Sequence, residues 1–173
     1  MLPQTTFYAA RDLLAEMERR GLTLATAESC TGGLIAAALT AIPGSSAVVT
    51  RGYVTYSNEA KQEMLGVPAG LLASVGAVSE AVARAMAEGA LRKSGADLAL
   101  SCTGIAGPGG ATLGKPVGLV FIGAAMRGGD TRVLRRVFPG DRAAVRAATV
   151  AEALALGREM LPQRQPLRPV PGR

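Results

Sequence analysis

The chain has 173 residues, a length typical of one domain, and 19 Lys and Arg against 13 Asp and Glu give it a net charge of +6. Hydrophobic residues make up 49% of the chain, as in globular rather than disordered proteins. Histidine is absent, which excludes a Ser-His-Asp triad, a Cys-His pair and a histidine-based zinc site. Acid–base catalysis would have to use Lys, Tyr, Cys or a carboxylate, and we expect neither metal nor cofactor.

Composition also restricts the partners. No apolar run reaches the ~20 residues of a membrane span, and no signal peptide is evident at the N-terminus, so we expect a cytoplasmic protein with no membrane partner. Cys30 and Cys102 fit a reducing compartment. Nucleic acid could bind a basic chain, but the arginines are scattered and aromatic residues make up only 3%. We therefore expect no nucleic-acid partner.

The predicted elements alternate between helix and strand. Apolar residues recur at helical spacing over 7–20 up to Gly21, and a short strand follows over 22–27. The Gly-containing turn at 28–33 opens a second helix that ends at Pro43-Gly44. Further strands are expected at 48–56, 98–101, 117–126 and 132–138, and further helices at 58–65, 78–93 and 142–160, capped by Ser57, Ser79 and Asp141.

One β-hairpin interrupts the alternation, because the turn signal at 127–130 joins two strands directly. The pattern predicts an α/β fold with helices on both faces of a mixed, mostly parallel sheet of about five strands. Residues 1–160 are expected to form this single domain. The Pro- and Arg-rich end, 161–173, is expected to be a disordered tail.

A candidate nucleophile follows the first strand. Ser29 lies in a strand-to-helix turn, and ligands of open α/β sheets bind at the carboxyl ends of strands. Backbone N–H groups at Thr31, Gly32 and Gly33 could hold an oxyanion or a phosphate. Local spacing alone favours a helix-capping role for Ser29 or Thr31. The two glycines shift the interpretation towards function, because they weaken the helix and let a ligand approach the backbone.

A candidate base lies on the expected helix 58–65. The chain has 16 Arg but only three Lys, and a buried lysine can lose its proton whereas arginine cannot. Lys61 is therefore a candidate base, and Tyr56 ends a strand near the same edge. Taken alone, Lys61 fits better as a solvated helix residue, and Tyr56 as a half-buried strand aromatic.

A Gly-rich loop follows the strand 98–101 and could surround a phosphate or a ribose with backbone N–H groups. It fails two phosphate motifs, because Pro116 replaces the Ser or Thr of a P-loop and Thr112 replaces the last Gly of a dinucleotide fingerprint. Long loops in compact domains are usually functional, so we favour a binding role. Its candidate residues are Thr103, Gly104, Ile105, Ala106 and Gly107.

Two arginines on the last expected helix, Arg142 and Arg146, are four residues apart and share one face. A phosphate would suit them. Two solvated arginines, balanced by Asp141 and Glu152, are an almost equally good interpretation.

Seven segments, in this order, resemble the CinA C-terminal domain family, whose enzymes are nicotinamide-nucleotide amidases. They are Thr26-Ala27-Glu28-Ser29-Cys30-Thr31-Gly32-Gly33, Pro43-Gly44-Ser45-Ser46, Gly52-Tyr53-Val54-Thr55-Tyr56-Ser57-Asn58-Glu59-Ala60-Lys61, Gly76-Ala77-Val78-Ser79, Thr103-Gly104-Ile105-Ala106-Gly107-Pro108, Lys115-Pro116-Val117-Gly118 and Gly140-Asp141-Arg142. The resemblance covers roughly residues 5–160, and seven segments in register are far more specific than any one. Many relatives carry an extra N-terminal domain, so this chain resembles the stand-alone form.

The resemblance implies hydrolysis of nicotinamide mononucleotide to nicotinic acid mononucleotide and ammonia, in NAD recycling. It implies Ser29 as nucleophile, Lys61 as base and Tyr56 as a supporting residue. In the mechanism we expect, backbone N–H groups at 31–33 or 103–107 hold the oxyanion, and Tyr56 positions Lys61 or relays a proton to the departing ammonia. Arg142 and the Gly-rich loop are expected to bind the phosphate. It also implies a three-layer α/β/α fold with five strands, like an anticodon-binding domain, and a homodimer.

Two other classes of function remain open. In a non-catalytic regulatory module, the same loops would bind a mononucleotide and Ser29 would only cap a helix. An RNA-binding domain is favoured by the charge and the implied fold, but the lack of aromatic residues argues against it.

Overall fold

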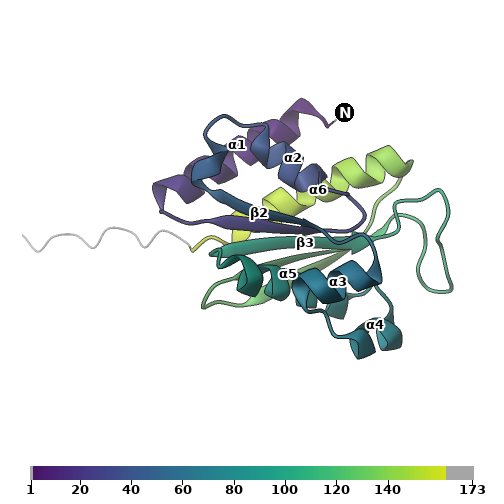
Figure 1. The fold of residues 1–173 in the computed structure, drawn as a ribbon. Helices are drawn as coiled ribbons and strands as arrows, with labels where there is room; N and C mark the ends of the chain where they lie inside the picture. Colours follow the sequence, from purple (N-terminus) through teal and green to yellow (C-terminus); the bar gives the residue numbers. More distant parts are fainter. Residues whose placement is uncertain (1, 163–173) are drawn as a thin grey trace, which may run out of the picture.

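The computed structural model describes residues 2–162 (Figure 1). Its helices are α1 (Gln4–Arg19), α2 (Leu34–Thr40), α3 (Asn58–Leu65), α4 (Ala69–Val75), α5 (Glu80–Ser94) and α6 (Arg142–Met160), with a 3-10 helix η1 (Ser45–Ala47). Its strands are β1 (Leu24–Glu28), β2 (Val49–Val54), β3 (Leu98–Gly104), β4 (Leu119–Met126) and β5 (Thr131–Val137). Of the expected tail, Leu161 is buried in the core, and residues 163–173 lie outside the described residues.

The strands form one mixed sheet in the order β2-β1-β3-β4-β5. β1 pairs in parallel with β2 and β3, whereas β4 runs antiparallel to both β3 and β5. Only β4 runs against the other strands, so the expected mostly parallel sheet and its β4–β5 hairpin are confirmed. At the end of β1, Glu28 lies beside Val54 of β2 and Cys102 of β3. The residues that follow these three parallel strands therefore meet at one edge of the sheet.

Helices cover both faces of the sheet, as Figure 1 shows, with α1, α2 and α6 on one face and α3, α4 and α5 on the other. The largest core cluster lies under the first group and includes Leu13, Leu39 and Ile122. The second largest lies under the second group and includes Leu65 and Met86. The expected three-layer α/β/α architecture is confirmed. Within residues 2–162, no helix combines the length and the apolar character needed to cross a membrane.

The structure confirms the three predicted helix caps, since Ser57, Ser79 and Asp141 each accept the N–H of the residue three positions ahead. The sequence analysis missed α4, a seven-residue helix that contains Gly70 and so has a weak helical signal. β3 is longer than expected and runs to Gly104.

Candidate active site

Ser29 is the first residue after β1, at the edge where the parallel strands end. Its N–H donates to the Cys102 carbonyl at 3.0 Å, and its own carbonyl accepts the Gly32 N–H at 3.1 Å. The main chain is therefore held on both sides of a half-buried side chain. Across residues 2–162 the Ser29 hydroxyl caps no helix; its Oγ instead lies 3.1 Å from Nζ of Lys61.

Lys61, on α3, is only 1% exposed. Its Nζ donates to the Thr55 carbonyl at 2.9 Å and to the Ser57 carbonyl at 3.4 Å, and lies 3.1 Å from Ser29 Oγ. Carbonyl oxygens only accept, so they take two N–H groups of the amine and leave its remaining tetrahedral position facing the serine. In the neutral amine that position would be a lone pair, which could accept the Ser29 O–H.

Burial sets the protonation of this amine. Desolvation lowers the pKa of Lys61 below its ordinary 10.5, against weaker opposing effects of Cys30, Cys102 and Glu59. The nearest partners of Nζ are two neutral carbonyls and a hydroxyl, none of which compensates the positive charge as a carboxylate would. Lys61 is thus shifted towards the neutral form that a base requires.

Cys30, next to the serine, is a poor rival nucleophile. Its thiol is buried, and hydrogen bonding with Cys102 together with burial raises its pKa. The thiolate is the reactive form of cysteine, so a raised pKa keeps this side chain inert.

Close helix packing positions the lysine. α3 begins at its Ser57 cap and lies against α5, where Gly89 faces the end of α3. A Cβ on Gly89 would lie 2.1 Å from the carbonyl oxygen of Leu65. Only glycine therefore allows this approach, which fixes the depth at which α3 carries Lys61.

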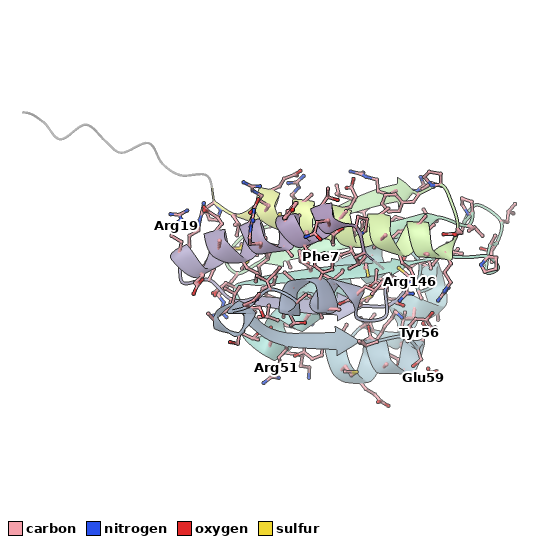
Figure 2. All side chains as sticks on the ribbon, turned by 90° about the horizontal axis from the view of Figure 1, so that it is seen from above. Phe7, Arg19, Arg51, Tyr56, Glu59 and Arg146 are labelled. Carbon is pink, nitrogen blue, oxygen red and sulfur yellow. The ribbon has the colours of Figure 1, made fainter. Side chains whose placement is uncertain are left out.

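Tyr56 contacts an arginine rather than the lysine. It is 59% exposed, and its hydroxyl accepts from Nη2 of Arg142 at 2.9 Å, while Nη1 of the same arginine donates to the Gly107 carbonyl at 3.0 Å. Figure 2 shows Tyr56 at the same end of the molecule as Arg146. Arg142 therefore bridges the β2–α3 connection and the Gly-rich loop.

The turn after Ser29 differs in detail from the expectation that its N–H groups are open to a ligand. The Gly32 N–H donates to Ser29, and the Gly33 N–H donates to the Glu28 carboxylate at 3.0 Å. The Thr31 hydroxyl points inward, 2.6 Å from Glu28 Oε2. The N–H groups of Cys30 and Thr31 have no acceptor within residues 2–162, and we call these two unpaired donors the open N–H groups of this turn.

The Gly-rich loop contributes shape more than side-chain donors. The Thr103 hydroxyl donates to the Ala77 carbonyl at 2.8 Å, and the Ile105 N–H donates to Leu119. Gly104 allows close packing, since a Cβ there would lie 2.7 Å from the carbonyl oxygen of Leu119. The loop and the start of α6 border an open cavity of about 640 Å³, lined by Ala106, Pro108, Val117, Gly140, Asp141, Arg142, Ala143 and Arg146.

This cavity adjoins the serine site without including Ser29 or Lys61 among its lining residues. Two arginines connect them. Arg142 reaches Tyr56, and Nη2 of Arg146 donates to the Thr31 carbonyl at 2.8 Å.

The sequence analysis missed the role of Glu28, a fully buried carboxylate directly before the serine. The available signal was an acidic residue that ends an otherwise uncharged strand next to a Gly-containing turn. The Thr55 carbonyl, a main-chain ligand of the lysine, left no signal in the sequence.

Comparison with known proteins identifies the family. A family model described as the CinA C-terminal domain matches residues 8–161. The chain belongs to the CinA C-terminal domain family. A CinA-like protein of Geobacter sp. (strain M21) is 60% identical over 144 residues, which are 83% of this chain and 34% of that protein. A CinA-like protein of Akkermansia muciniphila is 52% identical over 143 residues, again 83% of this chain and 34% of that protein.

Solved structures of CinA-family proteins share the fold. The competence/damage inducible protein CihA from Agrobacterium tumefaciens superposes with a TM-score of 0.88 at 48% identity, covering 90% of this chain and 95% of that one. A CinA superfamily protein from Escherichia coli gives a TM-score of 0.87 at 35% identity, covering 93% and 94%. The chain spans about a third of the length of the curated CinA-like relatives but nearly all of these solved chains.

Proposed function

We propose that this CinA-family chain is an amidase that hydrolyses the carboxamide of nicotinamide mononucleotide to the carboxylate and ammonia. The observation that carries the proposal is the buried Lys61 amine, 3.1 Å from Ser29 Oγ and held by two carbonyls. A serine activated by an adjacent base is the usual arrangement for acyl transfer, and this chain has no histidine to supply one.

Acylation begins when neutral Lys61 takes the proton of the Ser29 hydroxyl and Oγ attacks the carboxamide carbon. The tetrahedral oxyanion is stabilised by the open N–H groups of Cys30 and Thr31, each of which can lower the barrier by ~3 kcal/mol. Collapse breaks the C–N bond. Protonated Lys61 then gives its proton to the leaving nitrogen, which departs as ammonia.

Deacylation uses the same groups in reverse. Lys61, neutral again, takes a proton from a water molecule that attacks the ester of Ser29. The C–Oγ bond breaks, the acid product leaves, and the proton returns to Ser29 from Lys61. One lysine thus serves as base and acid in both halves of the reaction.

The substrate's phosphate accounts for the charged side of the site. Arg142 and Arg146 lie on the first turns of α6 and line a cavity whose other walls include Ala106, Pro108 and Val117. A guanidinium pair beside a small apolar cavity suits a phosphate with its sugar. Tyr56 orients Arg142 through its hydroxyl. A proton relay through Tyr56 is therefore no part of this proposal.

Ammonia release from a panel of pyridine nucleotides tests the proposal. Nicotinamide mononucleotide should be hydrolysed faster than its dephosphorylated nucleoside, and activity should fall on the acid side as Lys61 becomes protonated. Tight binding in calorimetry without ammonia release would instead favour a regulatory mononucleotide-binding module. The homodimer and the cytoplasmic location stay predictions, which ultracentrifugation and cell fractionation would test.

A further inference from the structure

The Glu28 carboxylate is a second buried ionisable group at this site, and the reaction steps above do not use it. Its side chain is 0% exposed. Oε2 accepts from the Thr31 hydroxyl at 2.6 Å and from the N–H groups of Gly33 and Ile35 at 3.0 and 2.9 Å. Oε1 accepts from the Ala36 N–H at 2.8 Å. A buried charge is costly unless hydrogen-bonded, and these four donors, three from the backbone, compensate it.

The same residue is anchored in the sheet. Glu28 is the last residue of β1, paired with Val54 on one side and Cys102 on the other, and its carbonyl accepts the Thr55 N–H at 2.8 Å. Its side chain reaches forward to the first turn of α2. Glu28 therefore closes a loop around the nucleophile, with the sheet at one end and α2 at the other.

This closure decides which donors stay open. Glu28 occupies the N–H groups of Gly33, Ile35 and Ala36, so these cannot reach a ligand. Cys30 and Thr31, between the two anchors, keep N–H groups without an acceptor in residues 2–162. The inward bond of the Thr31 hydroxyl to Glu28 fixes the orientation of that part of the turn.

We propose that Glu28 is the positioning residue of the nucleophile turn: its carboxylate holds Ser29 and the open N–H groups of Cys30 and Thr31 in the geometry that acyl transfer needs. The inference rests on the proposed serine chemistry. It goes beyond it by assigning the preorganisation of the site to a residue that touches neither the substrate nor the base.

Glu28→Gln is the informative variant, because it keeps the shape and replaces one acceptor oxygen by an NH₂ group. Even with the amide oxygen at the Oε2 position, the NH₂ group faces the Ala36 N–H, where two donors repel. Asp97→Asn is a matched control at the opposite end of the sheet, where the Asp97 carboxylate accepts the N–H and the hydroxyl of Thr23.

The first readout is the rate at which a fluorophosphonate labels Ser29, located by peptide mass spectrometry, because it needs the nucleophile and its donors but no amide substrate. We expect Glu28→Gln to slow labelling at least about tenfold, since losing one oxyanion donor costs that much or more. Both variants should lose thermal stability, because each disturbs hydrogen bonds of a carboxylate, but Asp97→Asn should label at the wild-type rate. Equal labelling of wild type and Glu28→Gln, or equal losses in both variants, would overturn the inference.

The second readout separates positioning from acid–base chemistry. Glu28→Gln should lower kcat for nicotinamide mononucleotide with little change in KM, and should leave the midpoint of the acid limb unchanged because that limb reports Lys61. A shifted midpoint would contradict a pure positioning role. If wild type is labelled but releases no ammonia, the proposed substrate is wrong and the role of Glu28 stands. If wild type is not labelled at all, both the proposed serine chemistry and the role of Glu28 are wrong.

Discussion

The substitution Gly89→Ala tests whether helix packing sets the position of the base. The added Cβ would lie 2.1 Å from the carbonyl oxygen of Leu65 and 3.1 Å from its Cβ. Because such contacts do not occur below 3.0 Å, α3 and α5 must separate by about 1 Å. Lys61 lies one turn before Leu65 on α3, so the amine moves with the helix.

The expected effects on stability and activity differ in size. Overpacking costs about 1–3 kcal/mol, and the better helix propensity of alanine returns about 1 kcal/mol. The net loss of up to about 2 kcal/mol corresponds to a fall in Tm of up to about 8 °C. A displacement near 1 Å between base and nucleophile can lower kcat about 100-fold.

The assay combines thermal denaturation with steady-state ammonia release. Gly157→Ala is the control, on the opposite face of the sheet. The nearest atoms to a Cβ there belong to the side chains of Leu100 and Leu13, at 3.2 and 3.4 Å. It should change Tm modestly and leave kcat unchanged. If Gly89→Ala retained wild-type kcat, packing against α5 would not set the position of Lys61.

Three further predictions concern charge. Wild type should gain stability relative to Lys61→Met as pH rises towards 10.5. The pKa of Lys61 is lowered in the folded protein, so the unfolded chain binds more protons in this pH range. Curves of Tm against pH that stay parallel for the two proteins would contradict this. Arg142→Lys should raise KM for the mononucleotide but not for its dephosphorylated nucleoside. One ammonium cannot bind Gly107, Tyr56 and a phosphate together as a guanidinium can. Equal changes in KM for both substrates would show that Arg142 does not bind the phosphate. Tyr56→Phe should raise KM for the mononucleotide less than Arg142→Ala does, and the double variant should have the same KM as Arg142→Ala alone. Additive effects on KM would show that the tyrosine acts independently of the arginine.

Local residue chemistry made much of the fold predictable. Ser57, Ser79 and Asp141 cap helices for the reason their type suggests, and the Gly-Gly-Asp turn produces the β4–β5 hairpin. The end of β3 was hidden because Gly104 has low strand propensity. Gly104 is required there because β4 packs closely against it, which only the tertiary structure reveals.

The site was less predictable from local pattern. Ser29 and Lys61 are 32 residues apart, and each alone fitted an ordinary helix role, so only the family resemblance linked them. The function of Glu28 depends on donors that fold back from α2 onto the end of β1. No local spacing rule encodes such a closure. The hydrogen bond between Tyr56 and Arg142 joins residues 86 positions apart, so it could not be predicted from local pattern either.

Ammonia release from nicotinamide mononucleotide, measured for wild type, Ser29→Ala and Lys61→Arg side by side, tests the central claim most directly. We predict an active wild type and two folded variants without activity, since arginine keeps the positive charge but cannot act as the base. Full activity of Ser29→Ala, or a wild type inactive on every pyridine nucleotide, would contradict the serine–lysine amidase.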